Sequence, residues 1–135
     1  MKSTILSLVI ALSAILGPCA REQRSVALNQ EFAIKAGETI SLEGSGVTIS
    51  FSEVADDSRC PKDVTCVWAG NAKVVISVSI RGRVPGKINL NTMLDPKEGT
   101  YSDFGIKLVN LEPYPKKGPR IKKSDYVATL VVRRK

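Results

Sequence analysis

The sequence contains no histidine. A chain without histidine cannot use Ser-His-Asp or Cys-His catalysis, and it lacks the imidazole ligands of most zinc and copper sites. It also lacks a glycine-rich phosphate loop and the aspartate spacing of a calcium loop. We therefore expect a protein that is not an enzyme and that holds no cofactor and no metal.

Aromatic residues are scarce, at 5% of the chain, whereas 43% of the residues are hydrophobic. Such a composition is typical of a globular protein, and its many Val and Ile side chains suit pleated strands better than helices. A length of 135 residues corresponds to one ordinary domain. The composition therefore favours a single β-rich domain.

Only the beginning of the chain carries a long uncharged apolar run, Ile5–Leu16, which follows Lys2. A helix that spans a bilayer needs about 20 apolar residues, so this run fits a cleavable signal peptide, assigned to residues 1–19. Its end, Leu16-Gly17-Pro18-Cys19, resembles the lipobox of lipoproteins, although Pro18 stands where a small residue is usual. The alternative is cleavage after Ala20 by an ordinary signal peptidase.

Three cysteines are present, and the close spacing of Cys60 and Cys66 predicts a disulfide between them in an oxidising compartment. That pairing leaves Cys19, which is either lipid-modified or removed with the signal peptide. With a lipid anchor, the protein is held on a membrane. We therefore expect export to the bacterial cell envelope, as a lipoprotein or in the periplasm, or alternatively secretion.

Basic residues exceed acidic ones, 20 to 13, which favours encounters with anionic partners. For an exported protein these partners are anionic lipid or polymer rather than nucleic acid. A candidate basic patch precedes the last expected strand: Lys116, Lys117, Arg120, Lys122 and Lys123. The patch is equally typical of a solvated loop, because no aromatic residues are interleaved for base stacking.

Period-two alternation of apolar residues runs from about Glu31 to the C-terminus. Residues 20–30 are polar and unpatterned, which suggests a tether to the domain at residues 31–135. The first third predicts three short strands in a meander, and residues 72–80 give the clearest strand of the chain. About eight short strands separated by Gly and Pro turns predict an all-β, antiparallel two-sheet sandwich, immunoglobulin-like or barrel-like, with one disulfide.

The densest motif is the stretch from Asp57 to Ala72, which reads DSRCPKDVTCVWAGNA. It resembles a family of small secreted or lipid-anchored bacterial proteins that carry Asp-Ser-Arg-Cys-Pro, a second cysteine after five intervening residues, and then Val-Trp-Ala-Gly-Asn-Ala. The likeness continues at residues 106–115 and from Ser124 through the final strand. This resemblance implies export and a β-rich fold, but it implies no activity.

The motif supplies a candidate interaction loop: Asp57, Arg59, Lys62, Asp63 and Trp68. Structural roles are the alternative, with Trp68 packed under the loop, Gly70 allowing a close backbone approach, and Asp57 paired with Arg59. Asp56, Asp57 and Asp63 also crowd this segment, but adjacent aspartates are far more often turn residues than an acid/base pair or a metal site.

Two functions remain open at the level of the sequence. The first is a non-catalytic extracytoplasmic interaction protein of unknown ligand. The second is a secreted proteinase inhibitor that presents Arg59 or Lys62 on the Cys60–Cys66 loop, because a rigid loop binds a protease with little loss of entropy.

Overall fold

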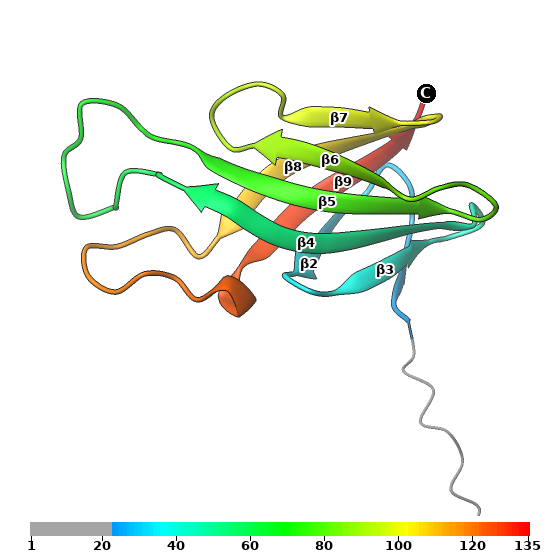
Figure 1. Ribbon diagram of the computed structural model, residues 1–135, viewed down its shortest axis with the longest axis horizontal. Helices are drawn as coiled ribbons and strands as arrows, with labels where there is room; N and C mark the ends of the chain where they lie inside the picture. Colours follow the sequence, from blue (N-terminus) through cyan, green and yellow to red (C-terminus); the bar gives the residue numbers. More distant parts are fainter. Residues whose placement is uncertain (1–22) are drawn as a thin grey trace, which may run out of the picture.

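The computed structural model describes residues 23–135, which form two β-sheets packed face to face (Figure 1). The expected signal peptide and Cys19 lie outside the described residues. The strands are β1 (Ser25–Val26), β2 (Glu31–Lys35), β3 (Thr39–Leu42), β4 (Val47–Asp57), β5 (Ala72–Ile80), β6 (Gly86–Asn91), β7 (Glu98–Tyr101), β8 (Phe104–Glu112) and β9 (Val127–Arg134). A single 3-10 turn, η1 (Lys123–Asp125), precedes β9. Within residues 23–135, none of the helical segments is long and apolar enough to cross a bilayer.

One sheet has the strand order β1-β3-β4-β5-β6 and the other has the order β2-β9-β8-β7. All pairs are antiparallel except β1 with β3. The all-β, two-sheet architecture and the Cys60–Cys66 disulfide are confirmed. Consecutive strands are neighbours from β3 to β6 and again from β7 to β9, so each sheet is built around a meander.

The N-terminal part of the fold differs from the sequence-based expectation in two ways. β2 pairs with β9 in the second sheet, so the chain changes sheets near Gly37 and the first three expected strands do not form one meander. The folded body also begins before residue 31, because Ser25 and Val26 pair with β3. Residues 25 and 26 of the expected tether are therefore part of a sheet, where backbone pairing outweighs their weak sequence pattern.

The core lies between the sheets, and the alternating positions point into it. Ile34, Ile49, Phe51 and Leu130 are fully buried, as the period-two pattern predicts. Register shifts interrupt the pairing of β4 with β5 and of β8 with β9. The shift between Leu108 and Asn110 accounts for the change of face before the buried Leu111, because an extra residue reverses the inward and outward positions.

Three connections come together at one end of the sandwich, at the left of Figure 1. The cysteine loop (residues 58–71) joins β4 to β5, the β6–β7 loop spans residues 92–97, and the proline loop (residues 113–126) joins β8 to β9. We refer to these three connections as the loop end. The tight β5–β6 hairpin, with Val84 at its tip, lies at the opposite end.

Candidate functional site

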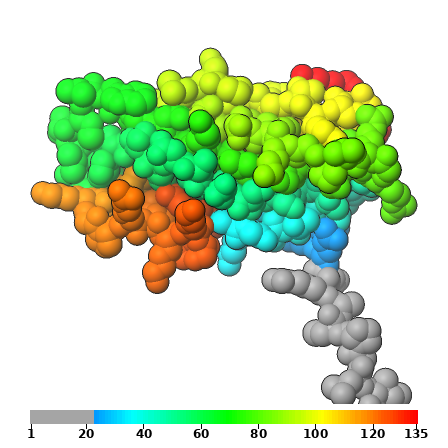
Figure 2. Space-filling model, viewed as in Figure 1, coloured from blue at the N-terminus to red at the C-terminus, as the bar shows by residue number. Residues whose placement is uncertain are grey.

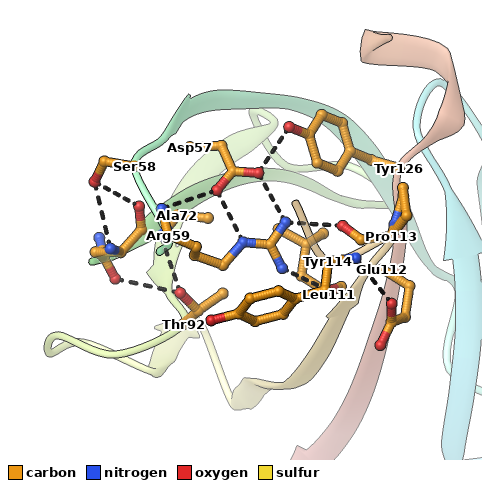
Figure 3. A network of polar contacts seen from close by, with 11 residues as sticks. Asp57, Ser58, Arg59, Ala72, Thr92, Leu111, Glu112, Pro113, Tyr114 and Tyr126 are labelled. Atoms are coloured by element: carbon orange, nitrogen blue, oxygen red, sulfur yellow. Dashed lines mark hydrogen bonds and ion pairs between the residues drawn. The ribbon is translucent and has the colours of Figure 1, made fainter. Parts of the chain in front are cut away.

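Arg59 is the centre of the loop end, and its side chain is only 3% exposed. Its guanidinium donates two hydrogen bonds to the carboxylate of Asp57, from Nε to Oδ1 at 2.8 Å and from Nη2 to Oδ2 at 2.7 Å. It also donates to the carbonyl oxygens of Leu111, at 2.7 Å, and Pro113, at 3.0 Å (Figure 3). A planar fork of N–H donors suits this geometry, and a lysine cannot reproduce it. Arg59 thus fastens the end of β8 to the base of the cysteine loop.

Asp57 lies between Arg59 and Tyr126, whose hydroxyl donates to Oδ2 at 2.8 Å (Figure 3). Burial raises the pKa of Asp57, but the hydrogen bonds from Arg59 and Tyr126 and the charge of Arg59 outweigh it, so the pKa lies below its ordinary value. Burial and the neighbouring carboxylate raise the pKa of Tyr126 to about 12. We call Asp57, Arg59 and Tyr126 the latch. Its charges are paired internally, so it forms a structural support rather than a reactive centre.

The cysteine loop and the proline loop are also joined outside the latch. The backbone N–H of Lys62 donates to the carbonyl of Pro115 at 3.0 Å, and the N–H of Lys117 donates to the Asp63 carboxylate at 2.7 Å. Two cations lie near the ring of Tyr114, whose centroid is 4.9 Å from the Arg59 guanidinium carbon and 5.7 Å from the Lys62 Nζ. The two loops therefore form one connected surface.

The β6–β7 loop is tied to the base of the cysteine loop by a buried amide. The Asn71 side chain accepts hydrogen bonds from the backbone N–H of Met93, at 3.0 Å, and of Leu94, at 3.2 Å, and donates to Asn91 Oδ1 at 2.9 Å. Asn71 and Asn91 are both less than a tenth exposed. All three connections of the loop end are thus held in place by buried polar side chains.

Most of the large apolar side chains that face solvent lie at the loop end. Of the seven large hydrophobic residues exposed in the described part of the chain, five are at the loop end: Val64, Val67, Trp68, Met93 and Leu94. We call these five residues the apolar tip. The expectation that Trp68 packs under the loop is wrong, because Trp68 is 54% exposed and its neighbour Val67 is fully exposed. The buried core consists of residues from the strands and Tyr126, and Trp68 is not among them.

The basic patch occupies the other side of the loop end. All five of its residues, Lys116, Lys117, Arg120, Lys122 and Lys123, are exposed. A groove of about 440 Å³ runs between the end of β4 and the proline loop, and its lining includes Lys116, Arg120 and Lys123. Figure 2 shows the cysteine loop in green and the proline loop in orange at the same end of the molecule. An apolar surface and a cationic groove thus lie at the same end of the molecule.

The structure separates the sequence-predicted residues into two groups. Asp57 pairs with Arg59, as the structural alternative predicts, and both belong to the latch, whereas Lys62, Asp63 and Trp68 are exposed. Sequence reasoning did not find Tyr114, Tyr126 or Asn71 as members of the site. Hydrogen bonds and contacts that cross from one loop to another leave no local pattern in a sequence.

The acidic side chains of the loop end do not converge. Among residues 23–135 there is no group of three or more Asp, Glu or Cys side chains placed to hold a metal ion. Asp57 faces Arg59, Asp63 accepts from the proline loop, and Asp56 is exposed.

We expect the latch to make stability depend on pH in the acid range. The pKa of Asp57 is lowered by folding, so its contribution is complete above its ordinary value, 3.8, and is lost as the pH falls through the lower folded value. Urea unfolding from neutral pH to about pH 2 measures this slope. The Asp57→Asn variant should be less stable at neutral pH and show a shallower acid slope than the parent. An unchanged slope would contradict the assignment, and Asp56→Asn, at the exposed neighbour, is the matched control.

The geometry of the loop end is the basis for any inference about function, since the motif at Asp57–Ala72 carries no assigned role. The family resemblance drawn from that motif stays a prediction. Comparison of the chain with protein-family models, with curated proteins and with solved structures finds no match.

Proposed function

We propose that this chain is a non-catalytic binding protein of the bacterial cell envelope and that the loop end is its binding surface. The observation that carries the proposal is the apolar tip, where Val67 is fully exposed beside the 54% exposed Trp68. Exposed apolar side chains gathered in one place are typical of interaction sites, whereas scattered ones need no explanation. Export, inferred from residues 1–19, supports the envelope as the compartment.

The disulfide and Arg59, which hold the cysteine loop in place, also favour a binding role for the apolar tip. The disulfide closes the cysteine loop, with 6.0 Å between the Cα atoms of Cys60 and Cys66, and Arg59 holds the base of the same loop. A loop ordered before it meets a partner loses little conformational entropy on binding. The buried polar groups therefore present Val67 and Trp68 in a fixed arrangement.

Photo-crosslinking in the intact envelope tests this surface. A photoreactive amino acid at Val67 is expected to give adducts several times more abundant than the same residue at Val84, which is 83% exposed at the opposite end. Adducts are separated by mass and identified as lipid or protein. Equal yields at the two positions, or no adducts at either, would overturn the loop end as the binding surface.

A proteinase inhibitor remains the second candidate, because the cysteine loop is braced and Lys62 on it is exposed. Arg59 cannot enter a protease pocket, since it is buried and four of its N–H groups are engaged within the protein. This candidate therefore depends on Lys62 alone.

A trypsin assay separates the two candidates. We expect trypsin to retain its full activity in the presence of a large molar excess of the protein, because the Lys62 backbone N–H is already bonded to Pro115 and its side chain lies over Tyr114. Inhibition that the Lys62→Ala variant loses would establish the inhibitor instead. The Lys97→Ala variant, at another exposed lysine, is the control.

A further inference from the structure

We propose that the partner of the loop end is the surface of an anionic phospholipid bilayer, with the apolar tip entering the headgroup region and the basic patch meeting lipid phosphates. This proposal rests on the proposed function and names its partner. It follows from the presence of apolar and cationic side chains on connected loops at one end of the sandwich.

The residues of the tip suit the boundary between water and lipid. Trp68 and its neighbour Val67 project from the cysteine loop, and Met93 and Leu94 follow on the β6–β7 loop beside its base. Tryptophan is enriched at membrane interfaces because its ring is mostly apolar and its N–H is polar. Together, the side chains of Val67, Trp68, Met93 and Leu94 on the two connected loops provide a shallow apolar contact rather than a deep pocket for one ligand.

Charge complementarity selects an anionic surface. Six exposed cations flank the tip on the cysteine and proline loops: Lys62, Lys116, Lys117, Arg120, Lys122 and Lys123. On the same two loops only Asp63 and Asp125 are exposed carboxylates, and Asp56 and Glu53 follow on β4, where Glu53 lies 3.9 Å from the Lys123 Nζ. Lysine and arginine near an anionic bilayer are each worth about a fivefold gain in affinity. Their long apolar stems also allow them to reach phosphates while the loops lie flat.

The groove between β4 and the proline loop gives this end a place for a headgroup. Its lining includes Lys116, Arg120 and Lys123 together with Ile121, Tyr126 and three prolines, in a volume of about 440 Å³. Asp56 and Asp57 also line the groove, but the charge of Asp57 is paired with Arg59, which leaves Asp56 alone against the three cations. A phosphate in this groove would therefore meet a net positive lining.

Trp68 is the only tryptophan of the sequence, so the fluorescence of the protein reports directly on contact between the apolar tip and lipid. The purified full-length protein is mixed with vesicles of phosphatidylglycerol and phosphatidylcholine, or of phosphatidylcholine alone. We expect the emission of Trp68 to shift to shorter wavelength, and to be quenched by brominated lipid, with the anionic vesicles only. High salt should reverse the shift, because exposed charges are screened. These signals arise at the loop end even if another part of the chain also holds the protein on the vesicle.

Matched variants separate the apolar and ionic contributions. Val67→Asp should weaken the vesicle-dependent shift about tenfold, since it replaces an apolar contact by a charge, whereas Val84→Asp should leave it unchanged. Lys116→Glu with Lys117→Glu should weaken it at least tenfold, against no change for Arg81→Glu with Lys87→Glu at the opposite end.

The two proposals fail in different ways. If Trp68 emission is the same with and without anionic vesicles, the lipid proposal is overturned. Protein adducts from position 67 in the crosslinking experiment would then leave the loop end as a surface for a protein. Absence of both signals would overturn the binding surface itself. A shift of equal size on phosphatidylcholine alone, insensitive to salt, would overturn the role of charge.

Discussion

Replacement of Arg59 by methionine should lower the free energy of unfolding by about 3–5 kcal/mol, because removal of one partner leaves the other charge buried and unpaired. Methionine keeps much of the apolar stem, but the Asp57 carboxylate, whose side chain is 10% exposed, would retain only the Tyr126 hydroxyl and the Arg59 backbone N–H. The carbonyls of Leu111 and Pro113 would lose their donors as well. Urea unfolding at neutral pH measures the loss.

Arg83 provides the matched control for this variant. Its side chain is exposed and donates one hydrogen bond, to Ser102 Oγ at 2.9 Å, so Arg83→Met should cost less than about 1 kcal/mol. If Arg59→Met does not fold, Arg59→Lys keeps the charge and removes the fork, and it should show an intermediate loss. A loss for Arg59→Met no larger than that for Arg83→Met would show that the latch contributes nothing particular.

A double-mutant cycle identifies the ion pair as the cause. The variant with both Asp57→Asn and Arg59→Met should lose less stability than the sum of the single variants, because the two residues share one interaction. Additive losses would mean that Arg59 acts mainly through the two backbone carbonyls. Either result bears on the loop end, since the same side chain connects β8 to the base of the cysteine loop.

The fold was predictable where side chains alternate over many residues. β4, β5, β8 and β9 carry long apolar patterns, and the structure places their buried residues as the patterns require. β1 falls in the segment expected to be a tether, and β7 is equally difficult to predict, because each is short and contains few apolar residues, so that only pairing with a neighbour makes it a strand. The sheet that β2 joins was also beyond local reasoning, since its partner β9 is at the other end of the chain.

The site was predictable only in part, because some of its contacts, like the pairing of β2 with β9, join residues that are far apart in the sequence. Asp57 and Arg59 are two residues apart, so their pairing is a local inference that the structure confirms. Tyr126 is 69 residues from Asp57, and no local pattern connects them. The interpretation of Trp68 was wrong because a lone tryptophan beside a disulfide is usually buried, whereas the aromatic residues in this core are three phenylalanines and Tyr126.

Gly70 should tolerate no side chain, and Gly70→Ala is expected to lower the free energy of unfolding by about 2–5 kcal/mol. Gly70 has a positive φ of 73°, and a Cβ built on it would lie 2.7 Å from the Cα of Arg59 and closer still to the carbonyl oxygen of Ser58. Those backbone atoms are fixed, because Ser58 and Asn71 are hydrogen-bonded across the base of the loop. The start and the end of the cysteine loop would therefore have to move apart beside Arg59.

Gly37 separates the two causes of this loss. Its φ is 84°, yet a Cβ there would meet nothing within 4 Å, so Gly37→Ala should cost only the left-handed backbone conformation, about 1–2 kcal/mol. Urea unfolding of both variants measures the difference between their losses in free energy of unfolding. This difference is the cost of moving apart the start and the end of the cysteine loop. Hydrogen exchange should show, for Gly70→Ala alone, faster exchange at the N–H groups of Ser58 and Cys60, whose partners are Asn71 and Ala69. Equal losses for the two variants would contradict the close approach, and they would leave the rigid support of Trp68 to the disulfide and Arg59.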